Sequence, residues 1–160
     1  MLNDTAYKNA GAAYIDAAYL QPAYTRIETV LLKAFALAPQ LVQPNLKAAK
    51  NNRVYELRSY ESASEKIFNN KVQMFNDGDE VGIFLKLNFN VVFYAQVVAG
   101  SKMPNLMYMT SFENMDDRNA HWKAFGSDSS WKKLSALPQY QHNVSHIDIV
   151  FLRGVEYSDF

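Results

Sequence analysis

The chain has 160 residues, 49% of them hydrophobic and 14% aromatic, which is enough for one globular domain or one domain with an extension. Sixteen basic and sixteen acidic residues are scattered and cancel to a formal net charge of zero, so the electrostatic footprint of a nucleic-acid-binding protein is absent. The lack of cysteine excludes disulfides and thiolate chemistry, and no apolar run reaches the roughly 20 residues of a membrane-spanning helix.

The first part of the chain predicts a helix, a strand and a linker. Apolar residues in 4–19 recur at the spacing of a helical stripe, and Pro22 stops the helix. Residues 26–35 are β-branched and apolar enough for a strand. The stretch 38–52 holds two prolines and has no apolar period, so we interpret it as a linker.

The remaining segment, 53–160, predicts one complete domain. Its elements are a strand at 53–60, helices at 65–76 and 80–87, strands at 89–99 and 105–112, helices at 115–125 and 131–136, and a strand at 146–153. Ser62-Ala63-Ser64-Glu65 has a capping-box pattern at the start of the first helix, and Gly126 is expected to end the third. The order β-α-β-β-α-β predicts an α+β, ferredoxin-like domain.

A partial repeat relates the two parts. A helix, Pro22-x-Tyr24 and a strand are matched by a helix, Pro138-x-Tyr140 and the last strand. Residues 1–37 therefore look like the C-terminal half of a preceding unit, although proline and tyrosine are also common at helix exits. A half unit cannot satisfy its strand edges, so another chain is the expected partner.

Four segments of 53–160 resemble the NIPSNAP family. They are VYELRSY (54–60), PNLMYMTSFENMDDRNAHWKAF (104–125), DSSWKKL (128–134) and SHIDIVFLR (145–153), and the resemblance covers about 55–158. It implies a dimeric α+β barrel, in which the sheets of two ferredoxin-like units pack face to face. Some bacterial relatives carry two units in tandem. The resemblance implies no defined reaction, and the wider superfamily holds haem-degrading and cofactor-free monooxygenases as well as binding proteins.

A charged strand, residues 53–60, carries the first candidate ligand contacts. Glu56 and Arg58 share a strand face with Tyr60, which leaves Tyr55 and Leu57 to face the helices. We interpret the charges as a structural ion pair or as barrel and interface residues. The alternatives are an anion site at Arg58 and, if burial raises its pKa, a general base at Glu56.

Four other residues complete the candidate ligand contacts. Tyr94, Tyr108 and Trp131 are aromatic side chains that can line a cavity between sheet and helices, although core packing is the simpler interpretation. His121 is a further candidate, at a pocket rim or as a haem ligand. No metal site is predicted. His142 and His146 are four residues apart, but they straddle a loop-to-strand junction, where that spacing does not put them on a common face.

We therefore expect a homodimeric binding or assembly protein that holds a small apolar or anionic ligand near Arg58 and Tyr94. The alternative is a monooxygenase-like or haem-binding enzyme; no catalytic residue is assigned, whether the chain is an enzyme stays open, and no cofactor is predicted apart from haem in that alternative. No nucleic-acid partner or membrane span is expected. The compartment is not fixed: the chain is soluble and cytoplasmic as written, and periplasmic if cut from a longer secreted precursor.

Overall fold

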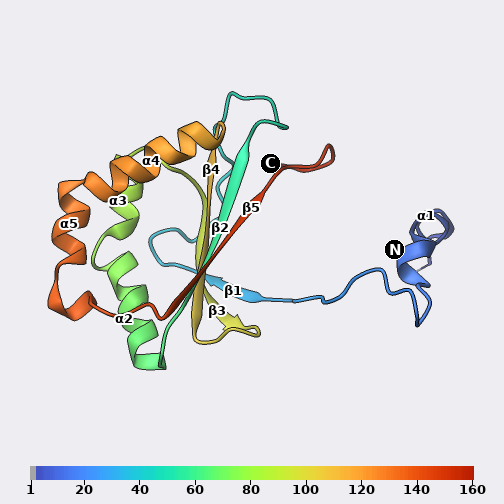
Figure 1. Cartoon of the computed structure of the whole chain (residues 1–160), viewed down its shortest axis with the longest axis horizontal. Coiled ribbons are helices and arrows are strands. Elements are labelled where there is room, and N and C mark those ends of the chain that lie inside the picture. Colours follow the sequence, from blue (N-terminus) through green and yellow to red (C-terminus); the bar gives the residue numbers. More distant parts are fainter. Residues whose placement is uncertain (1–2) are drawn as a thin grey trace.

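The backbone of the domain is one antiparallel sheet with helices on one side. The computed structural model describes residues 3–160. The strands are β1 (Leu31–Ala34), β2 (Val54–Glu61), β3 (Asn90–Ala99), β4 (Asn105–Phe112) and β5 (His146–Leu152), in the order β1-β3-β4-β2-β5. The helices are α1 (Thr5–Ile15), α2 (Glu65–Asn76), α3 (Glu80–Lys86), α4 (Met115–Ser127) and α5 (Ser129–Ser135), followed by a 3-10 turn, η1 (Pro138–Tyr140). Helices α2–α5 all lie on one side of the sheet (Figure 1).

The predicted element order of the complete domain is confirmed, with small shifts at the helix ends. Ser64, and not Ser62, caps α2: its Oγ accepts a hydrogen bond from the Ile67 amide at 3.3 Å. Ser62 is buried and donates instead to the Asn143 carbonyl at 2.8 Å. Gly126 lies inside α4, which continues to Ser127. The start of α2 is thus set by the serine nearer the helix, and α4 runs through its glycine for one more residue.

The core between sheet and helices is built from aromatic rings. Phe84 of α3 lies at its centre, with ring centroids of Phe89 and Phe125 at 4.8 Å and of Tyr108 at 5.7 Å. Such tilted and edge-to-face arrangements are the favoured geometries for aromatic pairs. Burying each phenylalanine stabilises the fold by about 1.5–3 kcal/mol. This rigid layer holds the polar side chains that reach into it from β2.

The strand face that packs under the helices differs from the predicted one. Glu56 and Arg58 contact Trp122 on α4, so this charged face points toward the helices. Alternation then places Tyr55 and Leu57 on the open face of the sheet. The prediction was wrong because it assigned the apolar side chains to the core, whereas partners on α4 satisfy the buried charges.

The N-terminal segment touches the domain through β1 and through residues on either side of it. The Ser101 hydroxyl donates to the Glu28 carboxylate, and Phe35 is buried in the core, with its ring against Phe75 and Tyr94. Helix α1 is capped by Asp4 and has no buried residue, and it stands apart on the side of the sheet opposite α2–α5 (Figure 1). The predicted helix 4–19 is thus shorter at its C-terminal end, and the predicted strand 26–35 is reduced to β1. That strand pairs antiparallel with β3 at one edge of the sheet.

The stretch 38–52 contains no helix or strand, but it is fastened to the domain. The Val42 amide donates to the Val92 carbonyl at 2.9 Å. The Glu113 carboxylate accepts hydrogen bonds from the amides of Lys47 and Ala48, and these bonds lower its pKa. The segment therefore follows the surface of the domain along a defined path.

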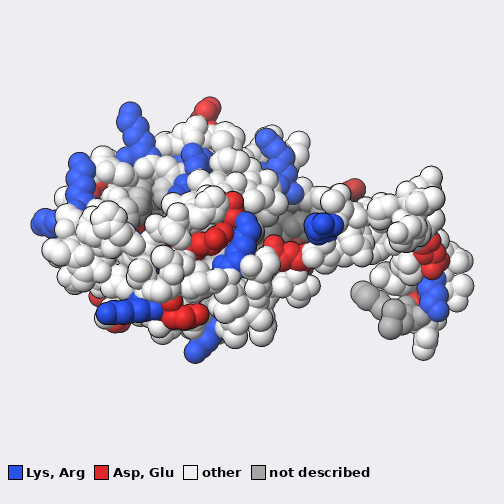
Figure 2. Space-filling model, turned by 60° about the horizontal axis from the view of Figure 1, so that its bottom comes forward, with Lys and Arg blue, Asp and Glu red and all other residues white. Residues whose placement is uncertain are grey.

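Basic and acidic side chains are interspersed on the face shown in Figure 2, most of which is uncharged. This distribution agrees with the zero formal net charge. Within residues 3–160, no helix combines the length and the apolar character that crossing a membrane requires.

Candidate ligand-binding site

A buried carboxylate on β2 organises the polar side chains of the helix-covered face. Glu56 is 0% exposed. It accepts hydrogen bonds from Arg58 Nε at 2.6 Å, from Arg118 Nε and Nη2 at 2.7 and 2.9 Å, and from Trp122 Nε1 at 2.8 Å. Burial alone would raise the pKa of this carboxyl, but the bonds from Arg118, Arg58 and Trp122 outweigh it and lower the pKa.

Glu56 is therefore held ionised with its acceptor positions in use. That environment is the opposite of the raised pKa on which a general-base role depends. The prediction of Glu56 as a possible base is thus not supported, whereas the predicted ion pair with Arg58 is present.

Helix α4 supplies two of the side chains that bond to Glu56, namely Arg118 and Trp122. The Asn114 side chain caps the helix by accepting from the Asp117 amide at 2.9 Å. Arg118 and Trp122 are four residues apart, so both project from one helix face. That face lies over β2, and both side chains reach the same carboxylate.

Arg58 is the cation that this arrangement positions. Its Cζ lies 3.6 Å from the ring centroid of Trp122, and its Nη1 donates to the Tyr60 hydroxyl at 3.1 Å. Burial would lower the pKa of Arg58, but Tyr108, Tyr60 and Glu56 raise it, so the guanidinium stays charged. Two guanidinium groups, those of Arg58 and Arg118, face one carboxylate, which leaves the cluster with excess positive charge.

Beyond Arg58 lie a pair of tyrosines and a buried ion pair. The hydroxyls of Tyr60 and Tyr108 are 2.7 Å apart, and burial raises the pKa of Tyr108, which keeps it a neutral phenol. Lys71 on α2 and Glu80 on α3 form a 2.8 Å ion pair, with each side chain only 4% exposed. Lys71 Nζ also lies 4.7 Å from the Phe75 ring centroid.

These groups line a cavity of about 410 Å³ between the sheet and helices α2, α4 and α5. Arg58 lies on one wall, and Trp122 and Trp131 contribute flat apolar surface. The volume is within the range of small-molecule sites, which are mostly apolar with a few positioned polar groups. The arrangement suits a small molecule with an anionic group and a flat apolar body.

The structure brings together only some of the predicted ligand contacts. Arg58, Tyr108 and Trp131 line the cavity, and Glu56 holds Arg58 from behind. Tyr94 lines a separate, more apolar cavity of about 380 Å³ beneath the segment Leu37–Pro44. His121 lies elsewhere, with Nδ1 2.9 Å from the Asp117 carbonyl oxygen and its ring against Phe89.

Sequence reasoning missed Lys71 and Glu80 as cavity residues. One signal was available for Lys71, which lies three residues after Phe68 and four before Phe75 on the buried stripe of α2. A lysine at such a position needs a buried partner. Nothing in the sequence singles out Glu80 as that partner, because it is the first residue of a different helix.

The sheet order and the helices on one face define a ferredoxin-like α+β domain with an internal cavity. The NIPSNAP family model matches residues 55–159, and the chain belongs to the NIPSNAP family. No curated protein matches the chain.

Three solved structures are similar to it. An uncharacterised NIPSNAP-like domain protein from Burkholderia xenovorans has a TM-score of 0.60 at 13% identity, covering 68% of this chain and 90% of its own. A NIPSNAP family protein from Agrobacterium tumefaciens has a TM-score of 0.58 at 16% identity, and the match covers 68% of this chain and 98% of that protein. Another NIPSNAP family protein from that organism, described as of unknown function, has a TM-score of 0.57 at 16% identity. The match covers 70% of this chain and 96% of that protein. At these identities the likeness shows the fold.

Proposed function

We propose that the chain is a small-molecule-binding protein that holds an anionic ligand in the cavity beside Arg58. The observation that carries the proposal is that the Arg58 guanidinium is held in place and still has an unused hydrogen-bond donor. Arg58 uses Nε for Glu56 and Nη1 for Tyr60, and its Nη2 has no hydrogen-bond partner among residues 3–160. An arginine that is fixed, charged and left with free donors can recognise a carboxylate or phosphate through two hydrogen bonds.

The geometry favours this binding protein over a haem-dependent enzyme. The haem-dependent form of the enzyme alternative would use His121 as the iron ligand. The His121 ring packs against Phe89 and Phe112, outside the cavity that Arg58 lines.

Binding can be followed with the chain's own fluorescence, because its two tryptophans, Trp122 and Trp131, both line the cavity. We expect benzoate, an aromatic carboxylate, to quench this fluorescence with saturation, and the neutral isostere benzamide to bind far more weakly. In Arg58→Met the affinity for benzoate should fall about 10–100-fold, the value of a charge-assisted hydrogen bond.

Arg26→Met is the matched control, since Arg26 is exposed and bonds only to the neighbouring Thr25 carbonyl. Its affinity for benzoate should equal that of the wild type. Absence of benzoate binding, or equal binding by the Arg58→Met variant, would contradict the anion site.

We further propose that two copies associate through the open face of the sheet. Apolar side chains on that face support the proposal: Leu57, Met109 and Val150 are cross-strand neighbours in the pairing register, and helices α2–α5 all lie on the other side of the sheet. An apolar sheet face is stable only when another layer covers it. Val150 is 46% exposed in the single chain.

Val150→Asp is therefore expected to convert a dimer into a monomer, as measured by size-exclusion chromatography with light scattering. An unpaired carboxylate in the interface would cost several kcal/mol. Leu85→Asp, at an exposed position on α3, should leave the dimer intact. A wild-type protein that is monomeric at micromolar concentration would show that the interface proposal is wrong.

Residues 1–37 are proposed to be the C-terminal half of a second unit, with 38–52 as the connection to the domain. Two features support this. The helix, Pro22-x-Tyr24 and strand pattern recurs at α5, Pro138-x-Tyr140 and β5. Helix α1, which has no buried residue, stands on the open side of the sheet, where a second layer would lie (Figure 1).

A further inference from the structure

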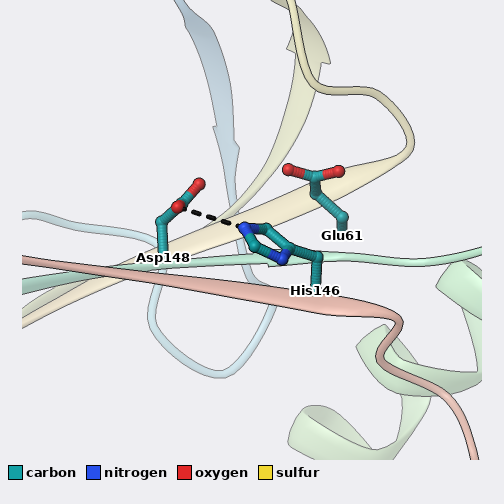
Figure 3. Close-up of side chains that lie close together, drawn as sticks. All are labelled: Glu61, His146 and Asp148. Atoms are coloured by element: carbon teal, nitrogen blue, oxygen red, sulfur yellow. Dashed lines mark hydrogen bonds and ion pairs between the residues drawn. The ribbon is translucent and has the colours of Figure 1, made fainter.

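A second group of side chains that could bind a ligand lies where β2 ends and β5 begins. It consists of Glu61, His146 and Asp148. Glu61 and His146 are directly opposite each other in the strand pairing, and Asp148 lies two residues along β5. All three therefore project from the open face of the sheet. Figure 3 shows the imidazole of His146 lying between the two carboxylates. One ligand atom from each residue lies within 4.8 Å of the other two.

The spacing of these atoms suits a metal ion. His146 Nε2 is 3.2 Å from Asp148 Oδ1. Two ligands that are each about 2.1 Å from a tetrahedral Zn²⁺ lie roughly 3.4 Å apart. Glu61 is half-buried on the same face, and a side-chain rotation is what would bring its carboxylate to that distance.

The local charge also favours a cation. Lys102 contributes an ammonium beside the group, and Asp148, Glu61 and Glu28 all act on it electrostatically. Three carboxylates of the described residues thus lie around this ammonium.

An independent observation comes from the next strand. Asn105 of β4 is the residue directly opposite Glu61 on its other side, and it lines the same cavity of about 280 Å³ as Asp148. Asn105 is 1% exposed, and its amide oxygen has no hydrogen-bond partner among the described residues. A buried, unused carbonyl oxygen beside two carboxylates is a further oxygen donor that a bound cation or its water would satisfy.

We propose that Glu61, His146 and Asp148 form a Zn²⁺ site that joins strands β2 and β5. An imidazole with two carboxylates selects a borderline ion such as Zn²⁺ over Mg²⁺ or Ca²⁺, which take oxygen ligands alone. The site lies on the sheet face opposite the cavity that contains Arg58. It is thus separate from the ligand-binding cavity, and it lies on the same face through which we propose that two copies associate.

Lys102 is the group that a metal ion must compete with. Its Nζ forms an ion pair with Asp148 Oδ2, which leaves Asp148 Oδ1 facing His146. Zn²⁺ binding and the Lys102 ion pair therefore oppose each other. This opposition gives the proposal a signature that nonspecific binding to surface carboxylates does not share, because removing Lys102 should increase the affinity.

The test is isothermal titration of ZnCl₂ into the full chain without a histidine tag. We expect one Zn²⁺ per chain, at least about tenfold weaker binding in His146→Ala, and similar loss in Asp148→Asn. Lys102→Met should bind about fivefold more tightly, since it removes one nearby positive charge. His142→Ala, at an exposed histidine outside the group, should match the wild type.

Each of the opposite results would overturn the site. They are the absence of saturable Zn²⁺ binding, His146→Ala binding as the wild type does, or loss of binding in His142→Ala. Weaker or unchanged binding in Lys102→Met would likewise contradict the arrangement. Lys102, His142 and His146 are exposed, Asp148 is half-buried, and none of the four belongs to the buried core. Thermal unfolding without metal should therefore give the same midpoint for all the variants.

Discussion

Glu56→Gln is expected to lower the free energy of unfolding by about 3–5 kcal/mol, the usual cost of breaking a buried ion pair from one side. The substitution keeps the shape of the side chain but leaves Arg58 and Arg118 without a counter-charge. It also places an amide donor where the carboxylate now accepts bonds from Arg58, Arg118 and Trp122. Urea unfolding followed by tryptophan fluorescence measures the change directly, because Trp122 is part of the cluster.

The control is Glu65→Gln, at an exposed position in the first turn of α2, with an expected change within about 0.5 kcal/mol. Equal stability of Glu56→Gln and wild type would mean that the cluster is not closed in solution. Acid unfolding gives a second measure. The pKa of Glu56 is lowered in the fold, so its contribution is present above the unfolded pKa and is lost as the pH falls through the folded value. The Glu56→Gln variant should lack that part of the acid dependence.

Lys71→Met is expected to cost a similar amount, about 3–5 kcal/mol, because it strands the carboxylate of Glu80 in the core. Both side chains of the pair are 4% exposed, and their surroundings include the Phe75 ring and Met74. A lone charge that is only 4% exposed has lost most of its hydration and has no ionic partner in its place. Unfolding in urea at neutral pH would measure the loss.

The double variant Lys71→Met/Glu80→Leu separates the value of the pair from the cost of breaking it. Replacing a buried ion pair by apolar groups of similar size is often neutral or stabilising, so the double variant should regain most of the lost stability. Lys86→Met breaks a pair whose lysine is 51% exposed, and should change stability much less than Lys71→Met does. A double variant less stable than Lys71→Met would show that the ion pair is worth more than its apolar replacement.

The fold was largely predictable because alternation and helical stripes in 53–160 report local geometry. The strand at 53–60, the hairpin strands and the Asn114 cap all appear where their patterns indicate. The orientation of β2 was not predictable in the same way. Which face carries Glu56 depends on Arg118 and Trp122, some sixty residues away, and a pattern within one strand contains no information about them.

The residues of the candidate site were likewise predictable only in part. Arg58, Tyr108 and Trp131 were identifiable as chemically capable residues, and they do line one cavity. Tyr94 and His121 were equally plausible by residue type, but the packing of α3 and α4 assigns them to other surroundings. Residue type indicates what a side chain can do, whereas the long-range packing of helices decides which side chains meet.

Strand β1 joins the sheet through four residues, of which only Leu32 is even partly buried. Phe35, the next residue along the chain, is 2% exposed and anchors the segment in the aromatic core. The solvated strand N-terminal to this anchor can therefore open at low cost while the core stays closed. Its detachment would uncover the edge of β3. The same backbone groups that now bond to β1 would then be free to pair with a strand from another molecule, which makes this edge the natural point for strand exchange.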